Sequence, residues 1–138
     1  LLLTQPSGHI MLVTLAAIIA AFDSAAYFVG RGIGGPKLWP KVSPGKTVSG
    51  SIAGLVAAIA LTLLLADVIG FADQLDALIL GLGLGILAQA GDLLESAIKR
   101  RLDVKDSGSI LPGHGGMLDR FDGYILVIPV FYSYSFHI

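Results

Sequence analysis

The stretch Leu75–Ile98 reads LDALILGLGLGILAQAGDLLESAI. Apart from Asp76 at its start, it is apolar through Ala90 and then gains the acids Asp92 and Glu95. A bilayer core about 30 Å thick needs about 20 largely apolar residues in a helix, because lipid offers no water to a bare backbone. The stretch therefore predicts a helix that spans a membrane and ends in a polar turn.

Three more stretches have the length and apolar character of membrane spans. With approximate bounds, they are Ile10–Gly30, Val48–Ile69 and Phe121–Ile138, of which the last is short and contains Pro129. We expect an all-α fold, a polytopic transmembrane helix bundle of about four spans with two motif loops. Residues 1–138 would form a single membrane-embedded catalytic domain.

The composition supports this class and excludes others. Hydrophobic residues make up 54% of the 138 residues and charged residues only 14%, which is too apolar for a soluble domain of this size. The formal net charge is -1, so we expect no nucleic-acid partner. The chain has no Cys, which excludes disulfides and thiolate sites. It begins without Met or a basic segment, so we expect no signal peptide and further sequence upstream.

The basic residues gather in two of the expected loops. All Lys and Arg lie in Arg31–Thr47 or in Lys99–Arg120, whereas the loop between the second and third spans carries only the acids Asp73 and Asp76. The positive-inside rule then makes both basic loops cytoplasmic, and four spans put them on the same side. We therefore expect an integral protein of the cell or inner membrane whose active-site loops are cytoplasmic.

The third span ends in a polar face. Asp92, Glu95 and Lys99 recur at helical spacing, so they share one side of the helix. This face is either a solvated helix end with an acid-to-lysine pair or a functional site, since ionisable groups are costly in a membrane. Asp119 and Asp122 are spaced i, i+3 at the mouth of the fourth span. With Asp92 they make an all-oxygen cluster, which suits Mg²⁺ and a polyphosphate better than zinc.

The first basic loop ends in a candidate anion site. Ser43, Lys46 and Thr47 precede the second span, and a lysine, hydroxyls and free backbone N–H groups at a helix N-terminus bind anions. A P-loop is excluded, because its first glycine would fall at Pro40 and we expect no strand before the segment.

Two further polar residues leave alternatives open. Asp23 in the first span is either half of a buried pair with a basic residue or a functional group of the same cavity. His114, between glycines, is a ligand, an acid or a turn residue. We favour a hydrogen-bonding or turn role for it, because no second His lies nearby. Small residues spaced i, i+4 predict helix-packing faces, and these are Gly50 with Gly54 and Gly81 with Gly85.

Together these residues resemble a known family, the phosphatidate cytidylyltransferases or CDP-diacylglycerol synthases. The family's signature resembles the run Ser96-x-x-Lys99-Arg100-x4-Lys105-Asp106-x-Gly108-x-x-Leu111-Pro112-Gly113-His114-Gly115-Gly116-x-x-Asp119-Arg120-x-Asp122. Its other recurrent segment is similar to Asp23-Ser-Ala-Ala-Tyr27-x-x-Gly30-Arg31 followed by Ser43-Pro44-x-Lys46-Thr47-x-x-Gly50. The resemblance covers about Phe22 to Asp122, and the chain looks like the C-terminal half of a longer enzyme.

The resemblance implies a nucleotidyl transfer in phospholipid biosynthesis, in which CTP and phosphatidate give CDP-diacylglycerol and pyrophosphate. It implies Mg²⁺ as the cofactor, with Asp92 and Asp119 as metal ligands. The implied catalytic residues are Asp92, Lys99, Asp119 and Asp122. The implied substrate-binding residues are Ser43, Lys46, Thr47, Arg100, Lys105, Asp106, His114, Gly115, Gly116 and Arg120.

Two other functions stay open from the sequence. One is a CTP-dependent membrane kinase that acts on a lipid or polyprenol, and the other is a transporter or structural membrane subunit. Besides CTP, phosphatidate and the lipid bilayer, a second copy of the chain in a homodimer is an expected partner. Helices absent from this chain would complete either the lipid groove or the dimer surface.

Overall fold

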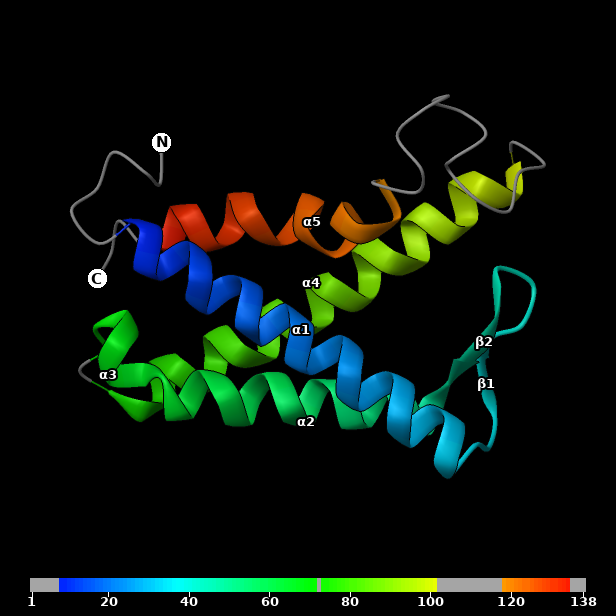
Figure 1. Ribbon diagram of the computed structural model, residues 1–138, viewed down its shortest axis with the longest axis horizontal. Helices are drawn as coiled ribbons and strands as arrows, with labels where there is room; N and C mark the ends of the chain where they lie inside the picture. The colour runs from blue at the N-terminus through cyan, green and yellow to red at the C-terminus, as the bar shows by residue number, and fades with distance from the viewer. Residues whose placement is uncertain (1–7, 72, 102–117, 135–138) are drawn as a thin grey trace.

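A computed structural model of the chain describes residues 8–71, 73–101 and 118–134. Within the last range, side chains are described only for residues 124 and 126–133. The elements in chain order are α1 (Gly8–Gly32), β1 (Lys37–Trp39), β2 (Ser43–Thr47), α2 (Val48–Leu64), α3 (Ala66–Ile69), α4 (Gln74–Arg101) and α5 (Leu118–Tyr134). The four long helices run along the molecule, with the two strands at one end and α3 at the other (Figure 1).

The described part of the chain is mostly helical, as expected, and two of its helices are long and apolar enough to cross a membrane. These are α1 and α4, which coincide with the first and third expected spans. The second expected span is interrupted, because α2 ends at Leu64 and the backbone at Leu65 departs from helical geometry before α3 begins. Its 17 residues extend over roughly 25 Å, slightly less than a bilayer core.

A short antiparallel hairpin between α1 and α2 corrects the expectation of an all-α chain. Lys37 pairs with Thr47 and Trp39 with Ser43, and the Val42 N–H donates to the Trp39 carbonyl in the turn. Strand β2 leads directly into α2, so the expectation that no strand precedes this segment is wrong. A P-loop is still excluded, because Lys46 lies within the strand rather than in a loop after it.

The glycine pairs pack α2 between α1 and α4, as predicted. A Cβ atom added to Gly54 would lie 2.9 Å from a ring carbon of Phe22 on α1. One added to Gly81 would lie 2.9 Å from the Ile59 Cα atom of α2, whereas one added to Gly85 would lie 2.6 Å from a methyl carbon of Leu55 and 3.6 Å from its Cα atom. Only glycine allows helix axes to come this near, so these positions are helix-packing faces.

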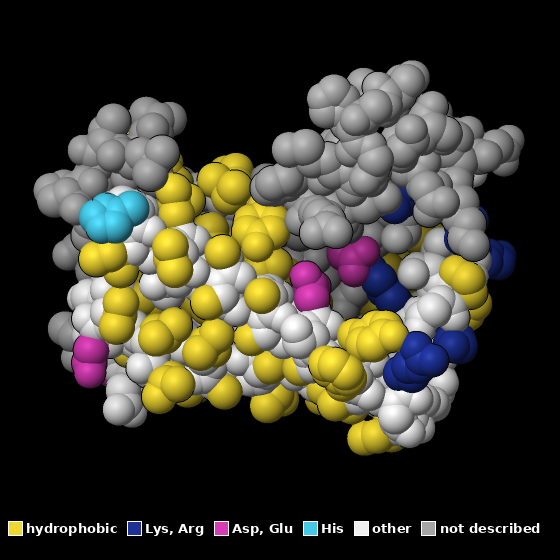
Figure 2. Space-filling model, viewed as in Figure 1, with side chains coloured by type: hydrophobic (Ala, Val, Ile, Leu, Met, Phe, Trp, Pro, Cys, Tyr) yellow, Lys and Arg dark blue, Asp and Glu magenta, His cyan; other side chains and the backbone are white. Residues whose placement is uncertain are grey.

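Apolar side chains lie both inside and outside the bundle. Ile18 on α1 is 1% exposed, whereas Phe28 on the same helix is 72% exposed. Figure 2 shows apolar side chains over the middle of the molecule, with Lys and Arg gathered at the hairpin end. An apolar outer band with a charged end is the surface expected of helices that face lipid.

The two basic segments meet at one end of the bundle as far as they are described. The Arg100 Nε atom at the end of α4 donates to the Val42 carbonyl of the hairpin over 3.3 Å. Asp67 and Asp76 belong to α3 and to the first turn of α4, at the other end of the bundle. The described basic segments Arg31–Thr47 and Lys99–Arg101 therefore lie at one end of the bundle. That this end is one side of a membrane, and the cytoplasmic side, stays a prediction, and Lys105 lies outside the described residues.

Candidate active site

The end of α1 and the start of α2 cross at two glycines. A Cβ atom added to Gly50 would lie 2.6 Å from the Ala26 carbonyl oxygen and 3.1 Å from the Gly30 Cα atom. The Thr47 hydroxyl, which is almost fully buried, caps α2 by accepting from the Gly50 N–H over 3.1 Å. This close crossing fixes where the hairpin leaves α1 and where β2 enters α2.

The start of α2 has fewer free donors than an anion site at a helix N-terminus would need. The Val48 N–H donates to the Pro36 carbonyl and the Gly50 N–H to the Thr47 hydroxyl. The expectation of a row of free N–H groups is therefore wrong at these two positions. An anion here depends mainly on the charge of Lys46 and not on the helix N-terminus.

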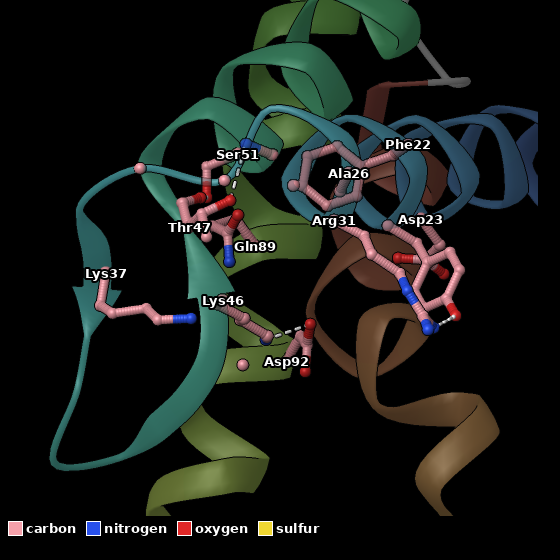
Figure 3. Close-up of a pocket in the computed structure, with 16 residues that line it drawn as sticks. Phe22, Asp23, Ala26, Arg31, Lys37, Lys46, Thr47, Ser51, Gln89 and Asp92 are labelled. Atoms are coloured by element: carbon pink, nitrogen blue, oxygen red, sulfur yellow. Dashed lines mark hydrogen bonds and ion pairs between the residues drawn. The ribbon is translucent and has the colours of Figure 1, made fainter.

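A cavity of about 750 Å³ lies between α1, the hairpin, α2 and α4 (Figure 3). Its walls include glycines and small apolar residues from the α1–α2 crossing. Charged and amide groups also line it, from three directions: Asp23 and Arg31 from α1, Lys37 and Lys46 from the hairpin, and Gln89 and Asp92 from α4. A concave site with a few convergent polar groups is the usual form of a ligand-binding site.

An ion pair between Lys46 and Asp92 crosses this cavity (Figure 3). The two side chains are 22% and 31% exposed, and the ammonium nitrogen itself is buried. The pair joins β2 to α4, so two of the predicted site residues meet although they are distant in the sequence. Because the surroundings are only partly hydrated, each charge stabilises the other more strongly than it would in bulk water.

Asp23 is exposed to the cavity from the middle of α1. Asp23 is therefore not buried, and it belongs to the lining of the same cavity, as one of the two interpretations expected. Its charge acts on Tyr124 of α5.

The charged residues at the end of α4 make two kinds of contact, one within the helix and one to the hairpin. Glu95 and Lys99 form the i, i+4 pair that was one interpretation of this face, with 2.9 Å between the carboxylate oxygen and the ammonium nitrogen. Arg100 reaches the hairpin instead, through its bond to Val42. Neither Lys99 nor Arg100 lines the cavity, and Ser43 begins β2 outside its lining. Their substrate roles stay predictions.

Most of the second motif lies outside the described residues. This holds for Lys105, Asp106, His114, Gly115 and Gly116. The backbone of α5 includes Asp119, Arg120 and Asp122, but their side chains are outside the described part. Among the side chains that the structure describes, no group of three or more His, Asp or Glu could hold a metal ion. The convergence of Asp119 and Asp122 on Asp92 therefore stays a prediction.

Three cavity residues escaped the sequence-based interpretation of the site. Arg31 belongs to a segment that resembles the family but was given no role of its own, Lys37 stands out only as a charge of a basic loop, and Gln89 is one polar residue in an apolar run. A usable signal exists for two of them. Gln89 lies one helical turn before Asp92, and Arg31 lies two turns after Asp23, so each shares a helix face with a suspected acid.

Comparison with known proteins places this arrangement in a family. The sequence pattern of the cytidylyltransferase family matches residues 1–138. The chain belongs to the cytidylyltransferase family. Relatives include phosphatidate cytidylyltransferases of Bacillus subtilis, 50% identical over 83% of this chain and 43% of the relative, and of Brucella suis, 46% identical over 95% of this chain and 48% of the relative. The enzyme of that name from Staphylococcus saprophyticus is 41% identical over 92% of this chain and 49% of the relative.

This cytidylyltransferase-family chain thus spans about half the length of the curated relatives it matches. Its apolar helices α1 and α4, taken with the family, make it a membrane protein. The cavity lies at the basic end of those helices.

Proposed function

We propose that this chain provides the nucleotide site of a phosphatidate cytidylyltransferase, which joins CTP and phosphatidate to give CDP-diacylglycerol and pyrophosphate. The observation that carries the proposal is the Lys46–Asp92 pair in a cavity at the basic end of an apolar helix bundle. Three of the relatives described above are named for this activity, which supports the proposal.

The reaction makes specific demands on such a cavity. A phosphate oxygen of phosphatidate attacks the α-phosphorus of CTP, the bond from that phosphorus to the bridging oxygen breaks, and pyrophosphate leaves with the electron pair. A phosphate monoester has a second pKa of about 6 and is mostly dianionic at neutral pH, so the nucleophile needs no general base. The difficulty is that two anions must approach each other, and the protein has to supply positive charge where they meet.

The hairpin is suited to hold the triphosphate. Lys37 and Lys46 face the cavity from β1 and β2, and the bond from Arg100 to Val42 ties the hairpin to α4. When an anionic nucleotide enters, Lys46 can exchange its carboxylate partner for a phosphate oxygen without being left uncompensated. Arg100 then acts by positioning the hairpin, while Lys99, Lys105 and Arg120 are proposed to steady the leaving pyrophosphate.

The donor chemistry of the cavity fits Mg²⁺. The Asp92 and Asp23 carboxylates and the Gln89 amide are hard oxygen donors on the walls of one space, and such donors suit Mg²⁺. We propose Asp92 as a ligand, with Asp119 and Asp122 completing the set from α5. A bound Mg²⁺ would supply positive charge to the phosphates. Because Asp92 pairs with Lys46, the ammonium would compete with a metal ion for this carboxylate.

The finer topology is part of the proposal. Four spans, namely α1, α2, α4 and α5, would place the hairpin in the cytoplasm and α3 on the opposite side. These 138 residues contain no Cys, so Lys41→Cys and Asp76→Cys can report sidedness in the full-length protein once any Cys outside them has been replaced. A membrane-impermeant maleimide should label the first only from the cytoplasmic side and the second only from the other side. Labelling of both from the same side would contradict four spans.

Labelled CTP tests the function itself. Membranes that contain the full-length protein carrying this chain are incubated with phosphatidate, Mg²⁺ and CTP labelled at either the α- or the γ-phosphate, then extracted with organic solvent. The α-label should enter the lipid phase and the γ-label should remain in water as pyrophosphate. Transfer of the γ-label alone would mean kinase activity, and no transfer of either label by the inserted protein would favour a transporter or structural subunit.

A further inference from the structure

Arg31 is a cavity cation that the second phosphate-bearing substrate could use. Its Nη1 atom, in the last turn of α1, donates to the Tyr27 hydroxyl over 2.7 Å. The guanidinium carbon also lies 5.9 Å from the centroid of the Tyr27 ring, within the range of a cation–π contact. Two contacts to one side chain hold the guanidinium in place beside the cavity that it lines.

The guanidinium retains most of its binding capacity. Among the described residues, it makes one hydrogen bond and no ion pair. The described ion pairs include none between Arg31 and Asp23, the acid two helical turns earlier on α1. Arg presents five N–H donors in a planar fork that matches a phosphate bidentately. Four of these donors are not engaged by any described residue.

The position of Arg31 separates it from the hairpin lysines. Figure 3 shows Lys37 and Lys46 on the hairpin side of Asp92 and Arg31 on the α1 side. The helix that carries Arg31 is apolar on its outside, where the Tyr27 and Phe28 rings are exposed and pack edge to face, 5.5 Å apart. An arginine beside exposed aromatic rings at the end of a membrane helix lies at the depth of lipid headgroups.

We propose that Arg31, positioned by Tyr27, binds the phosphate monoester of the lipid substrate, across Asp92 from the triphosphate site. The assignment rests on the proposed function, which requires two phosphate-bearing substrates in one cavity. The cations of the cavity would then serve two different substrates. The hairpin receives the soluble nucleotide, whereas the end of α1 receives the headgroup from the bilayer along its apolar face.

Kinetic constants for the two substrates test this division. In mixed micelles, Arg31→Gln should raise the KM for phosphatidate by about 10- to 100-fold, the range for a lost hydrogen bond to a charged group, and leave the KM for CTP within about twofold. Tyr27→Phe removes only the bond that orients the guanidinium, so it should raise the same constant by about 2- to 10-fold. The matched control is Arg101→Gln, because Arg101 is an exposed basic residue at the same end that does not line the cavity.

A binding measurement separates failure of this inference from failure of the proposed function. Calorimetry with dioctanoyl phosphatidate and with dioctanoylglycerol, which lacks the phosphate, gives the preference of the protein for the monoester without turnover. Wild-type protein should prefer phosphatidate, and Arg31→Gln should lose most of that preference. If the wild type makes no CDP-diacylglycerol, the function fails, but this ratio still reports on Arg31.

Two results would overturn the assignment. A rise in the KM for CTP with an unchanged KM for phosphatidate would place Arg31 in the nucleotide site. Unchanged constants and an unchanged binding preference, with only a lower yield of inserted protein, would make Arg31 an interfacial anchor of α1.

Discussion

In the middle of the bundle, α4 meets α2 at Gly81, where an added Cβ atom would lie 2.9 Å from the Ile59 Cα atom. At the hairpin end, α4 meets β2 through the ion pair of Lys46 and Asp92. The first contact is van der Waals packing between two helices and leaves no space or polar group for a ligand. The second is satisfied by charge, so an anion or a cation can compete with either partner. The same helix therefore serves stability in one half and binding in the other.

The largest effect is expected where charge alone holds the contact. Asp92→Asn removes the carboxylate proposed to bind Mg²⁺, so turnover should fall by at least about 100-fold while the protein still inserts and folds. Labelled product and thermal unfolding in detergent measure the two properties. Asp76→Asn, in the first turn of α4 at the opposite end, is the control and should retain activity. Wild-type turnover in Asp92→Asn would end the metal assignment.

A larger residue at the glycine contact should lower the stability of the protein. Gly81→Ala places a methyl group against the α2 backbone, and overpacking of this kind costs about 1–3 kcal/mol. Gly83→Ala is the matched control two residues away, because nothing lies within 4 Å of its added Cβ atom. That control should be neutral or more stable by about 0.5–1 kcal/mol. Equal melting temperatures for the two variants would show that Gly81 does not set the α2–α4 distance.

The exchange of partners at the ion pair can be measured without turnover. Lys46→Met removes the cation that competes for Asp92, so Mn²⁺ binding in the absence of nucleotide should tighten by about 10-fold, the scale of a charge-assisted contact. CTP binding by the same variant should weaken. Paramagnetic resonance of Mn²⁺ gives the first quantity and calorimetry the second. Lys41→Met, an exposed hairpin lysine outside the cavity, should change neither, and weaker Mn²⁺ binding to Lys46→Met would refute the exchange.

The smallest effect is expected at the link between α4 and the hairpin. Arg100→Ala removes the 3.3 Å bond to the Val42 carbonyl, a contribution of about 1 kcal/mol or less at an exposed position. Amides of residues 37–47 should then exchange hydrogen faster, while those in the middle of α2 do not. Arg101→Ala serves as the control. Unaltered exchange in the hairpin would show that Arg100 does not position it.

Several features of the fold followed from local rules. Three features depend only on residue type and spacing, and the sequence therefore predicts them: the apolar lengths of α1 and α4, the glycine pairs, and the basic residues at one end. The hairpin could not be predicted from the sequence, because Ser-Pro-Gly-Lys-Thr contains residues that are rare in β-strands. It forms where Lys37 and Thr47 can pair beside the α1–α2 crossing.

From residues alone come the class of helix bundle, the resemblance to the family and the suspicion that Lys46 and Asp92 serve one site, since each of these depends on local pattern. Tertiary packing decides that Lys46 and Asp92 meet across the cavity. It also places Arg31, hydrogen-bonded to Tyr27, beside that cavity. Side chains on separate elements are brought together by how closely the helices approach, and that distance is set where Gly30 meets Gly50, not by the spacing within any one segment.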